Sequence, residues 1–201
     1  MFSPKVILWG GVAGAFGGLF WMMMGLAPSG GDATLKFALV LGLGGLVGLY
    51  SQQARHGGIL GLAGFVLGII STVALFVADW IVPDLGNAQG ILILSLGFLT
   101  LGIGLALLGI TSLQAKTLHR LRGLPLVVGL LYIFAMAAFW IVFYIPFSHG
   151  QNPFDPWTPT AYLPVFALFV LIGIGWMGLG VTLAAEGDAL IPVARTPENV
   201  A

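Results

Sequence analysis

The chain is a succession of long apolar runs separated by short polar interruptions. Each of six runs comes close to or exceeds the roughly 20 residues that an α-helix needs to cross the hydrocarbon core of a bilayer. Helices are expected because every backbone N–H and C=O group must find a partner inside lipid, and the runs lack the alternation of β-barrel strands. The six predicted helices are Val6–Ala27, Thr34–Gln52, Gly58–Val82, Gly90–Ser112, Leu124–Pro146 and Ala161–Ala185.

Composition favours lipid over water as the surroundings of these helices. Of the 201 residues, 59% are hydrophobic and 7% are charged, and the mean hydropathy is +1.06. A soluble domain has roughly a quarter charged residues, because its surface faces water. The first run is longer than the apolar part of a typical signal peptide, so we expect it to be retained. We predict an all-α membrane protein, a six-transmembrane-helix bundle with a single transmembrane domain over 1–201.

The basic residues predict the orientation of the helices, because Lys and Arg resist translocation. The predicted topology has both termini in the cytoplasm, three helix hairpins over about 6–52, 58–112 and 124–185, and a short cytoplasmic tail over 186–201. The predicted location is the cell (inner) membrane, with several passes. This arrangement leaves Lys36 outside and places the other basic residues inside, namely Lys5, Arg55, Lys116, Arg120, Arg122 and Arg195.

A polar phrase that occurs twice suggests how the chain arose. Residues 48–55 read GLYSQQAR and residues 109–116 read GITSLQAK, each at the cytoplasmic end of an even-numbered run. Convergence could supply such residues, since any helix leaving the membrane passes through the headgroup zone. The match is nevertheless in register, and residues 180–187, GVTLAAEG, keep the glycine and the hydroxyl residue two positions later. We interpret the pattern as a duplicated hairpin with a degenerate third copy.

Glycine is the residue expected to hold the helices together. Apolar burial cannot drive helix association in lipid, so close packing of backbones must do so, and glycines four residues apart stack on one face. These faces are expected to pack inside the bundle; the alternative is that one of them contacts another subunit or a flat hydrophobic cofactor. The candidate packing glycines are Gly10, Gly14, Gly18, Gly44, Gly48, Gly57, Gly61, Gly64 and Gly68.

Few polar side chains interrupt the predicted spans. No Asp, Glu, Lys, Arg or His lies near the centre of a run, which argues against a proton-coupled carrier, an ion pump or an intramembrane hydrolase. Central hydroxyl residues such as Ser71 and Thr72 are expected to bond to a backbone carbonyl or across to a neighbouring helix. Trp21 is assigned to an aromatic belt at the outer boundary. The candidate interfacial residues are Asp79, Trp80, Trp140, Tyr144 and Trp157.

The histidines fit a bound haem poorly, because His56, His119 and His149 fall in the connections between runs. A pigment with one axial ligand could use His56 or His119, and Trp176 could line a lipophilic groove. A bound lipid, quinone or pigment therefore stays open as the ligand class. The chain has no cysteine, and no metal site is predicted. Its seven basic and seven acidic residues cancel, which argues against nucleic acid as a partner.

In general style, and without a specific motif, the chain resembles small, glycine-rich, six-helix bacterial integral membrane proteins. That resemblance implies no functional residue. We expect a non-enzymatic accessory or structural subunit that packs into a larger respiratory or photosynthetic complex, with membrane lipid and other membrane subunits as partners. The alternative is a carrier or channel for a small neutral or lipophilic molecule. A third interpretation is a membrane enzyme that uses Asp79 and His149 on the outer face.

Overall fold

The computed structural model describes residues 3–26, 31–54, 58–81, 88–116, 118, 122–144 and 163–191, with side chains for all of these except 31–32, 79–81, 88–91 and 143–144. The described residues contain no strand. The helices, in chain order, are α1 (Pro4–Leu26), α2 (Gly31–Gln53), α3 (Gly58–Ile81), α4 (Ala88–Ala115), α5 (Leu124–Phe139), the π-helix η2 (Trp140–Tyr144) that continues α5, and α7 (Leu163–Ala189).

Six helices are long and apolar enough to cross a membrane, with η2 contributing to the fifth span. The prediction of an all-α chain with six spans is confirmed for the described residues, and the structure fits a multi-pass membrane protein. Pro125 lies in the first turn of α5, where its missing N–H is not needed. Helices α4 and α7 run past the apolar segments, to Ala115 and Ala189. Helix α7 extends into the predicted tail, where Gly187 packs against the backbone of Leu8 on α1.

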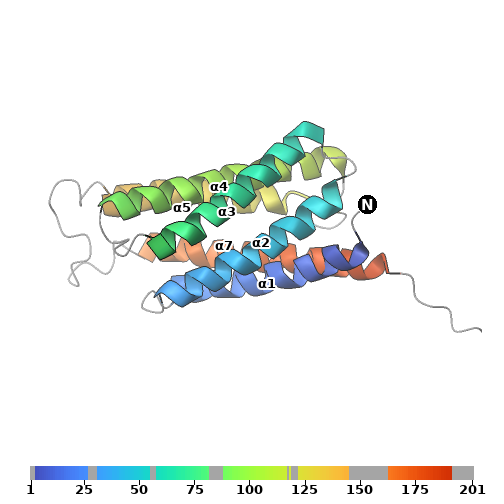
Figure 1. Cartoon of the computed structure of the whole chain (residues 1–201), viewed down its shortest axis with the longest axis horizontal. Coiled ribbons are helices and arrows are strands. Elements are labelled where there is room, and N and C mark those ends of the chain that lie inside the picture. Colours follow the sequence, from blue (N-terminus) through green and yellow to red (C-terminus); the bar gives the residue numbers. More distant parts are fainter. Residues whose placement is uncertain are drawn as a thin grey trace, which may run out of the picture.

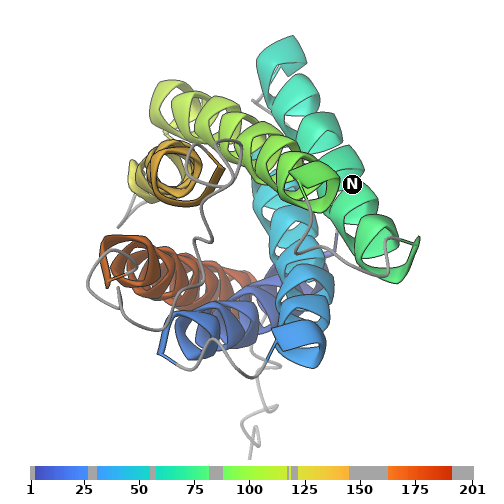
Figure 2. The same ribbon diagram turned by 90° about the vertical axis from the view of Figure 1, so that its left-hand side faces the viewer.

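The helices form two layers of three (Figure 1 and Figure 2). In the first layer, α1 lies between α2 and α7 and packs extensively against both. In the second layer, α4 lies in the same way between α3 and α5. The α2–α3 and α5–α7 contacts join the two layers into a ring and are smaller. The division does not follow the three sequential hairpins, because α5 and α7 belong to different layers.

The outside of the bundle is apolar, and every one of the six long helices exposes large hydrophobic side chains. Such a surface is unsuited to water and suited to lipid tails. Helix α3 shows the pattern clearly. Its buried face holds small and hydroxyl residues, including Gly64, Ser71 and Thr72, whereas Ile59 is 88% exposed and Val66 is 43% exposed. Small residues thus face the neighbouring helices and bulky residues face outward.

The described basic residues are sorted between the two ends of the bundle. The start of α1 and the ends of α2, α4 and α7 lie together, at the right in Figure 1. Lys5, Lys116 and Arg122 are at this end, which we call the basic end, whereas Lys36 lies near the start of α2 at the opposite end. The polar contacts between helix termini described below also lie at the basic end.

Candidate functional site

Helices α1 and α7 meet along two rows of glycines spaced seven residues apart. A Cβ atom added to Gly18 would lie 2.5 Å from the carbonyl oxygen of Gly173, and one added to Gly25 would lie 2.7 Å from that of Phe166. Ordinary contacts between carbon atoms are about 3.5–4.0 Å, so a larger residue requires a backbone to move. The rows are Gly11, Gly18 and Gly25 on α1, and Gly173, Gly180 and Gly187 on α7.

A second face of α1 packs against α2, again through glycines. A Cβ atom on Gly10 would lie 2.5 Å from the Cα atom of Gly48, and one on Gly14 would lie 3.3 Å from the Cα atom of Gly45. A Cβ atom on Gly44 would lie 2.8 Å from an alanine side chain of α1. Helix α1 therefore presents glycine to both of its neighbours in the first layer.

The helices of the second layer also make close contact at glycines. A Cβ atom on Gly64 of α3 would lie 2.8 Å from the carbonyl oxygen of Gly104 on α4, and Gly61 faces a threonine side chain of α4. Gly68 faces the side chain of Leu46 on α2, as well as the backbone near Gly104. The structure therefore places each described candidate glycine against another helix of this chain. The backbone-to-backbone contacts leave no width for a flat cofactor between these helices.

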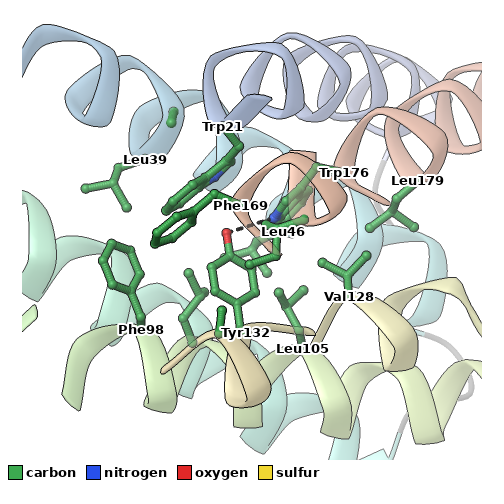
Figure 3. Packing of buried hydrophobic residues seen from close by; sticks show 14 of the residues in the cluster. Trp21, Leu39, Leu46, Phe98, Leu105, Val128, Tyr132, Phe169, Trp176 and Leu179 are labelled. Carbon is green, nitrogen blue, oxygen red and sulfur yellow. Dashed lines mark hydrogen bonds between the residues drawn. The ribbon is translucent and has the colours of Figure 1, made fainter. Parts of the chain in front are cut away.

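Bulky aromatic side chains fill the space between the layers (Figure 3). Trp21 of α1 stacks on Phe169 of α7 with ring centroids 5.7 Å apart, and it contacts Phe98 and Tyr132 of the second layer edge-on, at 5.4 and 5.5 Å. Trp21 is 2% exposed. Its assignment to the outer aromatic belt is therefore wrong. It lies one turn after the buried Gly17, on a face of α1 that points into the bundle.

Trp176 lies in this core rather than in a groove. Its indole N–H donates a hydrogen bond of 3.1 Å to the hydroxyl of Tyr132, which joins α7 of the first layer to α5 of the second (Figure 3). Both side chains are buried. A cavity of about 10 Å³ lies beside them, lined also by Trp21, Leu46 and Thr72 among others. This cavity has room for one water molecule at most.

The hydroxyl groups of Ser71 and Thr72 bond to their own helix, which is one of the two alternatives expected from the sequence. Ser71 donates to the carbonyl of Leu67 at 2.7 Å, and Thr72 donates to that of Gly68 at 2.8 Å. The buried polar residues that the structure describes are Ser, Thr and Gln, with no carboxylate, imidazole or amine among them. No general base is therefore available in the described interior to activate a hydroxyl as a nucleophile.

The three related phrases meet at the basic end. Gln52 of α2 donates a 2.8 Å hydrogen bond to the carboxylate of Glu186 on α7. The neighbouring Gln53 is fully buried, and its side-chain amide donates to the hydroxyl of Ser112 on α4. The amide oxygen of Gln53 has no hydrogen-bond partner. Gln52 and Gln53 at the end of α2 thus bond to the ends of α7 and α4, the two other helices that carry the related sequence.

A groove between α1 and α2 opens on the outside of the bundle near the basic end. Its volume is about 550 Å³. Lys5 is the charged residue in its lining, and Trp9, which is 66% exposed, is the aromatic residue. The lining residues are Lys5, Val6, Trp9, Gly10, Val40, Leu43, Gly44 and Val47.

Several candidates from the sequence lie outside the described residues. The candidate ligand residues His56 and His119, and also Gly57 and Trp157, fall in connections that are not described, as does His149. The side chains of Asp79, Trp80 and Tyr144 are not described either, although their backbones belong to α3 and η2. Among the interfacial candidates, the half-buried side chain of Trp140 at the start of η2 is described.

Comparisons with known proteins add no family to this picture. No protein-family model, curated protein or solved structure matches the chain. Within the described ranges, no cluster of three or more His, Asp or Glu residues could hold a metal ion.

Sequence reasoning missed three of these features, and one of them had a readable signal. Glycines seven residues apart occur at positions 11, 18 and 25 in the first run and at 173 and 180 in the last run, with Gly187 two residues beyond its end. This is the spacing of a continuous glycine face on a helix. The four-residue spacing that identifies the candidate glycines does not identify these seven-residue rows. The Trp176–Tyr132 bond and the Gln53–Ser112 bond join residues far apart in the chain, and no local pattern indicates either of them.

Proposed function

We propose that the chain is a non-enzymatic multi-pass membrane protein that serves as an accessory or structural subunit of a larger respiratory or photosynthetic complex. One observation carries the proposal: side chains from all six long helices fill the described interior, and none of the buried ones is Asp, Glu, Lys, Arg or His. Such an interior offers no described group for acid–base chemistry, and the described cavity of about 10 Å³ at its centre is too small for a substrate. The protein then acts through its outer surfaces.

The outer face of α3 is the surface that we propose for contact with another subunit. Ile59, Val66 and Val73 lie seven residues apart along α3 and are exposed. Ile70 and Val77, which are also exposed and seven residues apart, form a second row beside them. β-Branched side chains have restricted rotamers, so they lose little entropy when a partner helix packs on them. The candidate glycines are already occupied by helices of this chain, which leaves faces of this kind for association.

Photo-crosslinking in native membranes tests this surface. A benzophenone amino acid at Val66 of α3 is expected to give one discrete adduct with a second polypeptide. The matched control is Val181 of α7, which is 61% exposed and is expected to react with lipid. Native gels in mild detergent should show a species larger than the 21.0 kDa chain. A monomer in the native gel, together with lipid adducts alone at Val66, would count against the proposal.

We place the basic end, and with it both termini, on the cytoplasmic side of the cell (inner) membrane. The sorting of Lys5, Lys116 and Arg122 to that end supports this orientation. The chain has no cysteine, so single-cysteine variants give unambiguous labelling. An impermeant maleimide added to intact cells should label a cysteine at Ala33 and leave one at Ala54 unlabelled. The opposite result would reverse the topology.

We also infer that the hairpins arose by duplication. Thr111 and Thr182 each follow a glycine of the phrase by two positions, and each donates to the carbonyl four residues earlier, at 2.9 and 2.8 Å. The three phrase glycines, Gly48, Gly109 and Gly180, each meet the backbone of another helix. Grafting GITSLQAK onto positions 48–55 should preserve helical content in circular dichroism. Loss of the folded state would argue against equivalence of the phrases.

One observation favours a carrier for a small neutral or lipophilic molecule as a second candidate. The two layers are joined by the smaller α2–α3 and α5–α7 contacts, and a hydrogen bond between Trp176 and Tyr132 spans them at the core. Rocking of one helix group against another is how many carriers open a central site. Stopped-flow swelling of proteoliposomes in glycerol or urea tests it. Rates equal to those of empty liposomes would dismiss this candidate.

A further inference from the structure

We propose that the groove between α1 and α2 binds one anionic phospholipid, with an acyl chain in the groove and the phosphate at the ammonium group of Lys5. The groove is open to the outside and has a volume of about 550 Å³. Its described lining is apolar apart from Lys5. The site is independent of the subunit contact proposed for α3, because it lies on other helices.

The groove lies beside the contact between α1 and α2, where Gly10 and Gly44 are packed against the facing helix. Trp9 and Val40 stand at its rim, 66% and 53% exposed. The lining of α2 runs from Val40 to the last turn but one, which is about 10 Å along the helix axis at 1.5 Å per residue. An acyl chain lying parallel to the helices can occupy this length of apolar lining.

The charge at one end selects the headgroup. Lys5 is exposed in the first turn of α1, and its ammonium group forms no ion pair with any residue that the structure describes. A lysine at a helix end extends its ammonium group to the headgroup level while its methylene stem stays on apolar surface. The indole of Trp9, one turn further along, is of the residue type that concentrates at the same level. A phospholipid whose headgroup carries a net negative charge is therefore the complementary ligand.

Native mass spectrometry of the purified protein measures the site directly, with phosphatidylglycerol and phosphatidylcholine as the two probes. The wild type is expected to retain one phosphatidylglycerol more tightly than phosphatidylcholine. Lys5→Gln should weaken phosphatidylglycerol binding about fivefold and leave phosphatidylcholine unchanged. Lys36→Gln removes the same charge at the opposite end and should have no effect. Val40→Phe should weaken both lipids by narrowing the groove, whereas Val73→Phe, at a similarly exposed position of α3, should weaken neither.

The identity of the occupant is tested separately, by a benzophenone amino acid at Val40 in native membranes. An adduct with the mass of a phospholipid supports the proposal, and an adduct with a polypeptide overturns it. Equal affinity for the two lipids, or an unchanged affinity in both Lys5→Gln and Val40→Phe, also overturns it. Because Val40 is 53% exposed and Lys5 is at the surface, these variants should fold, and circular dichroism verifies that they do.

Discussion

Replacing Gly18 with alanine should destabilise the bundle, whereas the same replacement at Gly42 should not. Both residues are buried in long helices of the first layer, so the two variants change the same atoms in similar surroundings. At Gly18 the added methyl group would lie 2.5 Å from the carbonyl oxygen of Gly173 and 2.6 Å from the amide nitrogen of Met177. At Gly42 it would meet nothing within 4 Å.

The magnitude follows from the displacement that each methyl group forces. Relief of the contact at Gly18 requires α1 and α7 to separate by about 1 Å, since carbon contacts are about 3.5 Å or longer. Overpacking of this kind costs about 1–3 kcal/mol. Gly42 lines the cavity of about 10 Å³ in the core. There the methyl group fills empty space, and the helix gains about 0.5–1 kcal/mol from the replacement of glycine. The gain from replacing glycine is the same at both positions, so the two variants should differ by the overpacking cost, about 1–3 kcal/mol.

The assay is reversible unfolding in mixed micelles, in which the denaturing detergent fraction is raised and helical content is followed by circular dichroism. Gly18→Ala should unfold at a lower fraction of denaturing detergent than the wild type, and Gly42→Ala at the same fraction or a higher one. If the two variants unfold together, or if Gly18→Ala matches the wild type, then close backbone contact between α1 and α7 is not what holds the first layer together.

Three further predictions concern single hydrogen bonds and one strained backbone position. Tyr132→Phe leaves the indole N–H of Trp176 buried without an acceptor, so the variant should lose about 1–2 kcal/mol of unfolding free energy in the same assay, and an unchanged stability would contradict the bond. Ser112→Ala should destabilise the wild type more than a Gln53→Leu variant, because in the wild type it leaves the buried side-chain amide of Gln53 without its acceptor, and in the variant that amide is already absent. A double-mutant cycle with zero coupling energy would refute this. Lys116 follows the last residue of α4 with a φ of +53°, so Lys116→Gly should raise stability by up to about 1 kcal/mol, and a lower midpoint would show that the lysine side chain contributes more than its backbone costs.

Six spans could be predicted because their cause is local. A bilayer demands about 20 apolar residues per crossing and a backbone that satisfies its own hydrogen bonds, and both requirements can be read from a single run. The bonding of Ser71 and Thr72 to their own helix is local in the same sense. The candidate glycines were found by spacing, but spacing does not identify a partner. That Gly18 meets Gly173, at the other end of the chain, required the tertiary structure.

The two tryptophans of α1 show where the sequence stops being sufficient. Trp9 and Trp21 have the same chemistry, yet Trp9 is 66% exposed on the rim of the groove and Trp21 is 2% exposed between the layers. In water a hydrophobic face marks the inside of a protein, whereas in lipid both the inside and the outside are apolar. Hydrophobicity therefore determined that the helices cross a membrane, and the packing of six helices against one another determined which face of each helix is buried.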